Sequence, residues 1–533
     1  MVDLDGTDET QYLAIGLAMP HAGPPDAHTE VFFAPLYSTW YLALSTLQHD
    51  PVHLPGLNFR VLSVLLAWTL FALLRRVGCP AIVAALATFF LITHDLSLYP
   101  ATRSIHFAVL CLAVGILFAL RAATRVRQSC ALAIGATCAA FSRPEYTMLA
   151  IAMLGLAAIL YAVPRFREER SDWKFLVGAF GIALALAIGF GPPIGAGNDR
   201  SFIAFSQHFS LKYLQRHPSP VDPWWNGPVV MAQVFGPSQT LSQAFRANPS
   251  EFMIHVGTNL REAFTHFLPV SFSHRNFLLP DGHRWKTIEA GLVALLFFTL
   301  LLTERKRLGP NLRWFLRERP LVPVFLAGAF ALALAGMVLT STADRYFFPF
   351  VFFGLFFVVS LLGRRETAPA TASAPATPSL LLPPLWLAGF AVMLVGLTPA
   401  FSFREQNVTS TRSVVAELQR HSFRDGTGFV EALGMKRMEI FLPPQLHFVH
   451  PRNKTGSFRA FLEAGQVGVI HGTPYLRQSH NFATDAEWNE FIASPAKFGF
   501  SEIALPFQET LYIRDASLAH PGKTTGLAAV GAP

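Results

Sequence analysis

Asp8-Glu9-Thr10-Gln11-Tyr12 places two acidic side chains just ahead of several hundred mostly apolar residues. A helix-like run from Leu13 to Met19 follows and favours an amphipathic helix on a bilayer surface. A carboxylate beside apolar helices acts as a general base when it stays ionised and faces a hydroxyl. Alone, however, such a stretch is more typical of a solvated chain end. Its meaning therefore depends on the rest of the chain.

The composition of the chain indicates a membrane protein. Of its 533 residues, 52% are hydrophobic and 14% are charged, and the mean hydropathy is +0.38. Soluble domains carry about 25% charged residues. Repeated apolar runs of roughly 17–20 residues are long enough to cross about 30 Å of hydrocarbon as helices. We therefore predict a polytopic α-helical membrane protein.

The net charge of +8 does not indicate nucleic-acid binding, because the Arg and Lys residues cluster in short loops between apolar runs. The four cysteines lie in or beside apolar runs without CxxC spacing and are interpreted as small core residues. The histidines show no HExxH pattern, so we predict no metal ligands and no cofactor, and the sequence gives a divalent metal no support.

The apolar runs define the membrane domain, residues 34–365, and its topology. They lie near residues 57–74, 80–98, 104–121, 129–163, 175–194, 287–303, 320–340, 345–363 and 380–399, with a shorter run over 34–48. The strongly basic residues 304–319 are expected on the cytoplasmic side. Counting crossings from there places the segment 195–286 and everything after residue 400 outside. The predicted location is the cytoplasmic (inner) membrane.

The front half leaves two topologies open. If residues 1–33 form an outer acidic loop, an odd number of crossings must separate them from the inner residues 165–174. Run 129–163 is interrupted by Ser142-Arg143-Pro144-Glu145. Counted as two helices, it requires that 34–48 does not cross; counted as one broken helix, it requires that 34–48 does cross. The first choice also places Arg75-Arg76 and 121–127 inside, and we favour it.

The chain after residue 365 changes in kind. An Ala/Pro/Thr linker over 366–379 precedes the last span, 380–399. Residues 400–515 alternate helical and β-type segments, which predicts a small α/β domain on the outer face. The predicted helices are a short one between Ser457 and Gly465 and one after the capping-box pattern 484–487, and the predicted strands are 439–441, 446–449, 467–471 and 502–505. Residues 516–533 are predicted to be disordered.

Three arginines, Arg103, Arg143 and Arg345, stand close to the ends of apolar runs rather than inside basic loops. Ionisable residues at such depths are costly and tend to be paired or to serve a ligand. A guanidinium there could clamp a phosphate, and Arg345 is the best candidate because it falls on the predicted outer side. A snorkelling arginine or a helix-to-helix ion pair explains the same pattern.

Taken together, the order of these motifs resembles the GT-C superfamily of polytopic membrane glycosyltransferases, in its protein mannosyltransferase and aminoarabinose transferase-like branch. The acidic stretch is similar to an Asp-Glu-x-x-Tyr pattern of that family. The further similar motifs are Ala34-Pro35-Leu36-Tyr37, Leu57-Asn-Phe-Arg60, Tyr99-Pro-Ala-Thr-Arg103, Phe141-Ser-Arg-Pro-Glu145 and Asp344-Arg345-Tyr346-Phe-Phe-Pro349. The resemblance covers about residues 5–400 and leaves out the C-terminal tail.

The resemblance implies transfer of a sugar from a polyprenyl-phosphate donor to a lipid, glycan or protein acceptor, with inversion at the anomeric carbon. It implies that Asp8 is the base, with Glu9 as its catalytic partner and Glu30 as a supporting carboxylate. Tyr12, Arg103, Arg345 and Tyr346 would then bind substrate. A phosphate leaving group is already charged, so it needs cations more than a proton.

One departure from the family concerns the first residues. The family has a transmembrane helix just before the acidic loop, and no apolar run precedes Asp8 here. We expect that the true start lies upstream. The alternative function is a membrane transporter or lipid-binding protein of similar fold; a transporter would be expected to carry polar residues within several spans, which these runs largely lack.

Overall fold

The structure is a computed structural model of the whole chain. It describes residues 8–23, 34–98, 103–163, 171–193, 200–219, 227–271, 305–363, 411–431, 439–451, 454–473, 476–477, 480–505 and 509–519. The predicted runs 287–303 and 380–399, the linker 366–379 and Glu30 lie outside the described residues. So does most of the tail predicted to be disordered.

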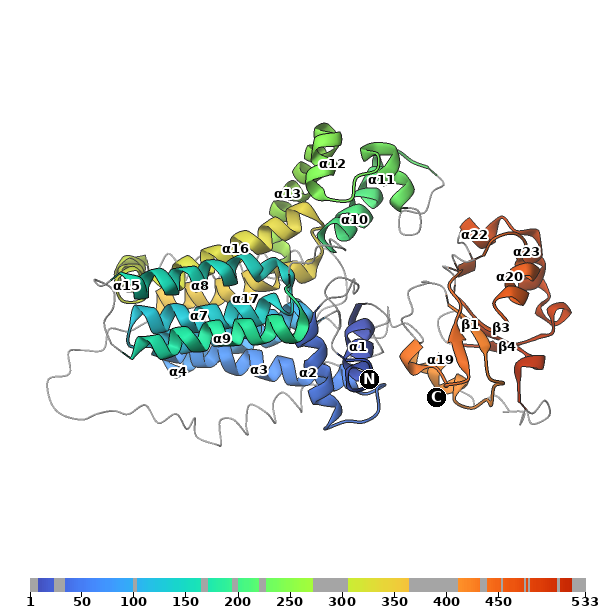
Figure 1. Cartoon of the computed structure of the whole chain (residues 1–533), viewed down its shortest axis with the longest axis horizontal. Coiled ribbons are helices and arrows are strands. Elements are labelled where there is room, and N and C mark those ends of the chain that lie inside the picture. The colour runs from blue at the N-terminus through green and yellow to red at the C-terminus, as the bar shows by residue number, and fades with distance from the viewer. Residues whose placement is uncertain are drawn as a thin grey trace.

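Apolar helices form the larger part of the molecule (Figure 1). Six described helices are long and apolar enough to cross a membrane: α3 (Leu54–Arg76), α6 (Ser104–Arg121), α8 with its preceding turn (Pro144–Ala162), α9 (Asp172–Phe190), α16 (Leu321–Leu339) and α17 with its preceding turn (Asp344–Gly363). The shorter α4 (Ala81–Thr93) and α7 (Arg125–Ala140) lie among them. Apolar side chains on α9 are exposed, for example Leu184 and Ile188, as expected of a lipid-facing surface. The predicted polytopic α-helical membrane protein is confirmed.

The long run 129–163 folds as two helices. Helix α7 ends at Ala140, and α8 (Thr147–Ala162) begins after a turn, η1 (Pro144–Tyr146). Pro144 disfavours helical backbone at Arg143, which is extended here. The apolar segment at 34–48 forms only the 11-residue α2 (Pro35–Ser45), too short to cross a bilayer. The length of α2 agrees with the topology that we favoured, in which 34–48 does not cross. Helix α7 has 16 residues and is not one of the six described helices long and apolar enough to cross, so whether 129–163 crosses twice stays a prediction.

Helices α6 and α7 cross closely because glycines face each other. A Cβ atom built on Gly135 would lie 2.8 Å from the Cys111 carbonyl oxygen and 2.9 Å from Gly115 Cα. Small residues allow this backbone approach, which replaces the hydrophobic effect as a source of helix association in lipid. All four cysteines are free, as the sequence predicted.

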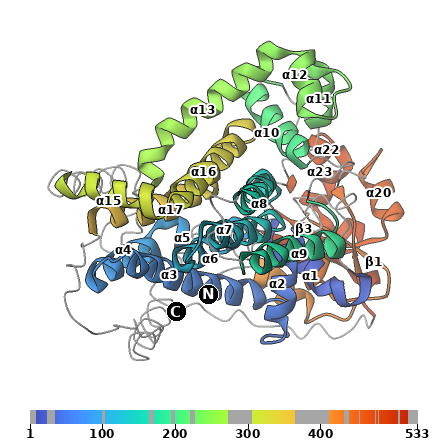
Figure 2. The ribbon, with the colours of Figure 1, turned by 60° about the vertical axis from the view of Figure 1, so that its left-hand side comes forward.

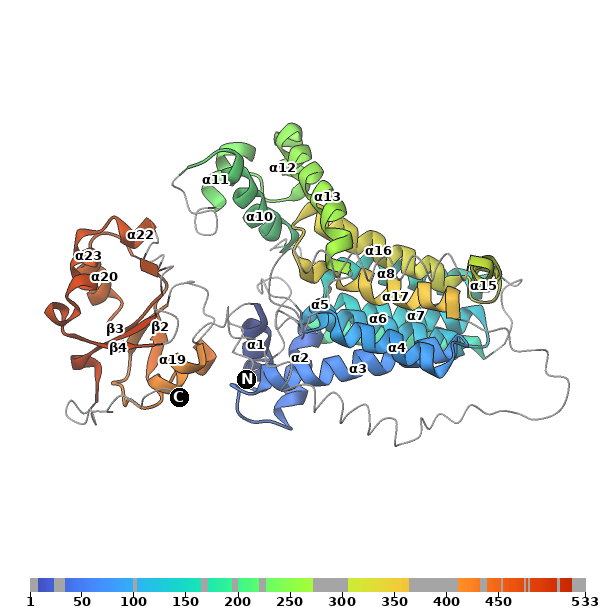
Figure 3. The ribbon, with the colours of Figure 1, turned by 180° about the vertical axis from the view of Figure 1, so that it is seen from behind.

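The two ends of the bundle are occupied by different elements (Figures 1 and 3). One end holds α1 (Asp8–Ala22), α2, α5 (Asp95–Leu98), and a helical subdomain made of α10 (Arg200–Arg216), α11 (Gly227–Phe235), α12 (Leu241–Ala247) and α13 (Pro249–Ser271). This subdomain covers most of the predicted outer loop and has its own aromatic core, including Phe205, Phe209 and Phe235. The opposite end holds α15 (Arg305–Glu318).

The chain after residue 410 forms the predicted small α/β domain. Its mixed five-stranded sheet has the order β2-β1-β3-β5-β4, parallel among the first three strands and antiparallel at β5 and β4. The strands are β1 (Thr427–Val430), β2 (Leu446–Phe448), β3 (Val467–Gly472), β4 (Phe500–Ala504) and β5 (Thr510–Arg514), and the helices are α19 (Thr411–Leu418), α20 (Phe458–Ala464), α22 (His480–Ala483) and α23 (Ala486–Ala493). Short turns of 3-10 helix are η4 (Glu439–Phe441), η6 (Pro495–Phe498) and η8 (Asp515–Ser517).

Three of the four predicted strands are present in this domain. The prediction was wrong at 439–441, which is a turn, and it missed β1 and β5. Ser457 caps α20 as predicted, but α23 is capped by Asp485 rather than Thr484, since its carboxylate accepts from the backbone N–H groups of Glu487 and Trp488. Strand β1 contains Gly428, where a Cβ atom would lie 2.4 Å from the Gly465 carbonyl oxygen.

Candidate functional site

The acidic stretch forms the start of a helix. Helix α1 begins at Asp8, whereas the sequence predicted a loop followed by a helix from Leu13. Asp8 is therefore the first residue of α1. Its side chain lies outside the described part of the structure.

Glu9 is buried and acts as the centre of a hydrogen-bond network. Only 3% of its surface is exposed. Its Oε1 accepts hydrogen bonds from the Tyr37 and Tyr41 hydroxyls and, at 2.8 Å, from Asn58 Nδ2. Its Oε2 accepts from the backbone N–H of Arg103 at 2.9 Å. One carboxylate thus joins α1 to α2, to α3 and to Arg103, the residue just before α6.

The two tyrosines that bind Glu9 remain hydroxyl donors. Burial, and after it the charge of Glu9, raises the pKa of Tyr37 and of Tyr41 well above the ordinary value. Both hydroxyls therefore stay protonated over the working pH range and keep donating to the carboxylate. These hydrogen bonds hold Glu9 in place. Glu9 in turn fixes the position of α1 and of the neighbouring Asp8 backbone.

A glycine brings α1 against α2. A Cβ atom on Gly16 would lie 2.3 Å from the Ser38 carbonyl oxygen and 3.1 Å from Tyr41 Cβ. The backbones of the two helices are therefore as close as a residue without a side chain allows. This contact places Glu9 within reach of the two tyrosines of α2.

Arg103, predicted to bind substrate, is turned into the protein. Its Nη1 donates to the Ser97 carbonyl oxygen at 3.2 Å and lies 3.1 Å from His106 Nε2, and its guanidinium lies 4.5 Å from the ring centre of Phe59. The side chain is buried. In this conformation Arg103 contacts Ser97, His106 and Phe59 at the start of α6.

Two other predicted motifs come together around Tyr346. The guanidinium carbon of Arg143, from the break between α7 and α8, lies 5.3 Å from the centre of the Tyr346 ring. That of Arg345 lies 5.4 Å from the same ring, in the turn η3 (Asp344–Phe347) that precedes α17. Arg143 also donates to Glu145 Oε1 at 2.7 Å. All four side chains are half-buried. The fold therefore gathers two cations and a phenol in one place.

Helix α1 adjoins this cluster through Tyr12. The buried Tyr12 is close enough to Arg143 to interact with it electrostatically. Its ring also packs edge-to-face on Tyr37, at 5.4 Å between ring centres. Asp8 precedes Tyr12 by four residues, about one turn of helix. Helix α1 therefore lies beside the Arg143–Tyr346–Arg345 cluster, with Tyr12 as the residue between them.

A further network, missed from the sequence, ties the helical subdomain to this site. Lys212 of α10 forms an ion pair with Glu262 of α13 and donates to Asn259 Oδ1. The Glu262 carboxylate also accepts from Thr342 Oγ1 at 2.7 Å, two residues before η3. These residues are far apart in the sequence and form no motif. These contacts could be predicted only if the packing of α10 against α13 were already known.

The pKa values of two groups in this network, Glu262 and His255, are both lowered. Burial opposes ionisation of Glu262, but hydrogen bonds from Lys212 and Thr342 outweigh it and lower the pKa of Glu262. Burial and then the charge of Lys212 lower the pKa of His255 to about 4. His255 is therefore neutral at physiological pH, and its Nε2 lies 3.0 Å from Asn259 Nδ2.

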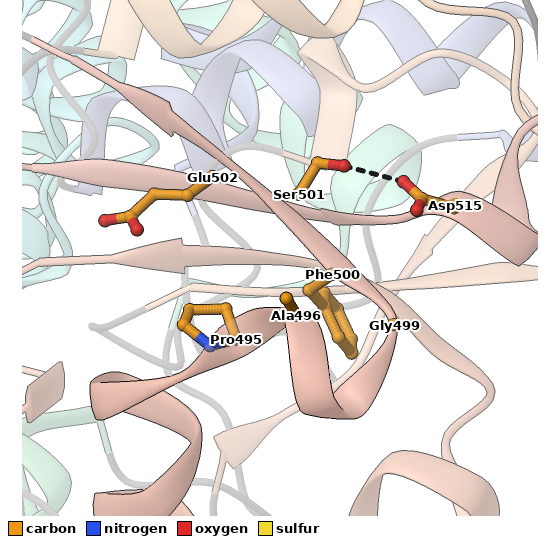
Figure 4. A pocket seen from close by; sticks show the side chains of 7 residues that line it. All are labelled: Pro495, Ala496, Gly499, Phe500, Ser501, Glu502 and Asp515. Carbon is orange, nitrogen blue, oxygen red and sulfur yellow. Dashed lines mark hydrogen bonds between the residues drawn. The ribbon is translucent and has the colours of Figure 1, made fainter.

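A metal centre and a pocket in the C-terminal domain are the two alternative candidates for a site. Within the described residues, no group of three or more His, Cys, Asp or Glu side chains is arranged to hold a metal ion. A shallow pocket of about 320 Å³ lies in the C-terminal domain beside the edge strand β4 (Figure 4). Ser501 there donates to Asp515 at 2.7 Å, while Glu502 points away from the pair. No histidine is among the residues that line this pocket, so it lacks the Ser–His pair typical of an activated serine.

Comparison with known proteins gives matches to solved structures alone. No family model matches the chain, and no curated protein matches its sequence. Among solved structures, the chain is similar to the crystal structure of ArnT from Cupriavidus metallidurans in the apo state. The sequence identity is 13%, the match covers 98% of this chain and 96% of that chain, and the TM-score is 0.39.

Proposed function

We propose that the protein is a membrane glycosyltransferase of GT-C type that moves a sugar from a polyprenyl-phosphate donor to an acceptor. The observation that carries the proposal is the joining of the acidic end of α1 to the Arg143–Tyr346–Arg345 cluster through Tyr12. A carboxylate and two cations at one end of an apolar bundle match what transfer from a lipid phosphate requires.

The arginine cluster would bind the phosphate of the donor. A guanidinium is planar and always charged, and its N–H groups fit two phosphate oxygens at once. Arg143, in the break between α7 and α8, and Arg345, in the turn η3, both approach the Tyr346 ring, so a phosphate beside the ring would meet both cations. The negative charge that develops on the leaving phosphate oxygen would be stabilised there without a proton.

Asp8 would accept the proton of the acceptor. In a direct displacement, the acceptor oxygen attacks the anomeric carbon, the bond from that carbon to the phosphate oxygen breaks, and the configuration inverts. The electron pair of the broken bond leaves with the polyprenyl phosphate, and the acceptor proton moves to the Asp8 carboxylate. Glu9 acts as a positioning residue in this proposal, because its carboxylate is already occupied by four donors.

The remaining predicted residues take supporting roles. Glu30 would be a second carboxylate near the acceptor, and Arg103 would position α6 rather than bind phosphate. The site would face the outside of the inner membrane, since the opposite end of the bundle carries the basic helix α15. The C-terminal domain would share the outer side.

Replacing Asp8 by Asn tests the proposed base. We expect roughly a hundredfold or greater loss of sugar transfer, the usual contribution of a general base, with unchanged abundance in the membrane. Transfer is measured as glycan product in a strain that lacks the chromosomal gene and expresses each variant. Asp50→Asn is the matched control, because Asp50 is an exposed loop residue. Full product from Asp8→Asn would refute the base, and a transport phenotype without any product would favour the transporter.

Arg345→Lys tests the phosphate clamp separately. Lysine keeps the charge but loses the bidentate fork, so we expect about tenfold weaker use of the donor and little change in use of the acceptor. Arg345→Gln should be several times worse than Arg345→Lys. Equal activity of all three proteins over a range of donor concentrations would remove Arg345 from the site.

A further inference from the structure

The basic end of the bundle contains two arginines side by side. Arg76, the last residue of α3, donates from Nε to the Leu120 carbonyl oxygen at 3.4 Å. Arg319, just after α15, donates from Nη1 to the Ala122 carbonyl oxygen at 2.9 Å. Both carbonyls belong to the C-terminal end of α6, where helix carbonyls lack partners and attract cations. The two guanidinium groups are therefore held at one place from two different helices.

Among the described residues, the charges of these two arginines have no ion-pair partner. Neither forms an ion pair with a carboxylate among the residues that the structure describes. Burial, and after it the charge of Arg76, lowers the pKa of Arg319, with Glu318 opposing. Two like charges held together in this way repel each other. An anion between them would remove the repulsion.

Helix α15 lies beside this pair and crosses the direction of the spanning helices. Figure 1 shows it end-on while α16 and α17 run across the view, and Figure 2 shows it lengthwise. It is held to α17 by Asn311 Nδ2, which donates to the Leu361 carbonyl oxygen at 2.7 Å, and by the buried Phe315, which packs on Phe357. The helix therefore runs across the spanning helices, which is the direction expected of a helix that lies on a membrane surface.

The outer surface of α15 carries two parallel rows of different chemistry. Leu312 and Leu316 are 39% and 54% exposed and lie one turn apart. The next residues, Arg313 and Arg317, are exposed and also one turn apart, and Lys306 is exposed on the same side as them. An apolar row beside a basic row is the pattern of a helix that rests at the boundary between acyl chains and headgroups.

We propose that this end of the bundle binds the phosphate headgroup of an anionic phospholipid, with Arg76 and Arg319 as the phosphate ligands and α15 lying in the headgroup layer. The charge of the arginine pair complements a phosphodiester. The exposed leucine row selects a lipid over a free anion, because an inorganic phosphate would leave that row in water. The site lies at the opposite end from the proposed transferase site and does not depend on that function.

The test uses the purified full chain in neutral detergent with phosphatidylglycerol or phosphatidylcholine added. Bound lipid is counted by native mass spectrometry, and the melting temperature is followed in parallel. We expect phosphatidylglycerol to bind and to raise the melting temperature, and phosphatidylcholine to do so much less. A surface cation near anionic lipid contributes about 1 kcal/mol, so Arg76→Gln/Arg319→Gln should weaken phosphatidylglycerol binding about 25-fold.

Two further variants control for lost charge and for misfolding. Arg420→Gln/Arg424→Gln removes the same charge from the exposed surface of the C-terminal domain and should bind lipid like the unmodified protein. Lys306→Gln/Arg313→Gln/Arg317→Gln changes only exposed side chains, so it should fold and still bind phosphatidylglycerol more weakly. Equal phosphatidylglycerol binding by all variants would overturn the proposal. Equal stabilisation by inorganic phosphate, or by phosphatidylcholine, would overturn the assignment to an anionic lipid.

Discussion

The two ends of the helical bundle use charged side chains in opposite ways. At the α1 end, Glu9 is buried with four hydrogen-bond donors, and Arg143 is half-buried against Glu145 and Tyr346. At the α15 end, Arg313 and Arg317 are exposed and stand beside exposed leucines. Because the first set is buried, removing or displacing one partner should destabilise the fold, since an unmatched buried charge is costly. Because the second set is exposed, we expect substitutions there to change the stability of the fold little. Their charges are also available to a surface outside the protein.

The comparison predicts its largest effect at Glu9. Glu9→Ala leaves two tyrosine hydroxyls, an amide and a backbone N–H without their acceptor, so we expect a loss of about 3–5 kcal/mol in the free energy of unfolding. Glu9→Gln keeps an acceptor oxygen and should lose less. Thermal or denaturant unfolding in detergent measures both variants, with the exposed Glu463→Ala as control. An alanine variant as stable as the control would show that the Glu9 network is not structural.

The second prediction concerns the acid side of the pH scale. The pKa of His255 is about 4 in the folded chain and about 6.5 when unfolded, so the unfolded state binds more protons between these values. Stability should be complete above about pH 6.5 and should fall by up to about 3 kcal/mol as the pH approaches 4.

His255→Gln is the matched variant for this prediction. Glutamine does not titrate and keeps an acceptor for Asn259, so the variant should lose much less stability over the same pH window. The lowered pKa of Glu262 affects stability only at lower pH. Its contribution is lost as the pH falls below the ordinary pKa of glutamic acid. Parallel pH profiles for the two proteins would contradict the assignment.

The third prediction separates close helix packing from open surface. Gly16→Ala places a methyl group against the Ser38 carbonyl oxygen, so α1 must shift, and we expect a loss of about 1–3 kcal/mol together with reduced sugar transfer. Gly178→Ala on α9 meets open space and should be neutral or stabilising by up to about 1 kcal/mol. Melting temperatures and product formation measure both, and equal behaviour would mean that α1 tolerates displacement.

The smallest effect is expected at the basic end. Arg313→Gln/Arg317→Gln removes two exposed charges, and the free energy of unfolding in neutral detergent should change by no more than about 0.5 kcal/mol for each. A loss comparable with that of Glu9→Ala would show that both ends use their charges for folding, and the contrast between them would fail.

Some features could be predicted because they depend on local pattern alone. The apolar helices follow from run length, the break between α7 and α8 follows from Pro144, and the capped helix α20 follows from Ser457 and Gly465. Strands β1 and β5 were missed because their stability comes from pairing with β3, which lies far away in the sequence. The acidic stretch was expected as a loop because two leading carboxylates resemble a solvated chain end.

By itself the sequence determined that this chain crosses a membrane, where its basic residues gather, and that Asp8, Arg345 and Tyr346 deserve testing. Only the tertiary structure decided that Glu9 is a buried acceptor, that Arg103 faces inward, and that Arg143 joins Arg345 around Tyr346. The physical reason is that solvation and charge partners set the role of an ionisable group. Those partners come from helices that a one-dimensional pattern cannot bring together.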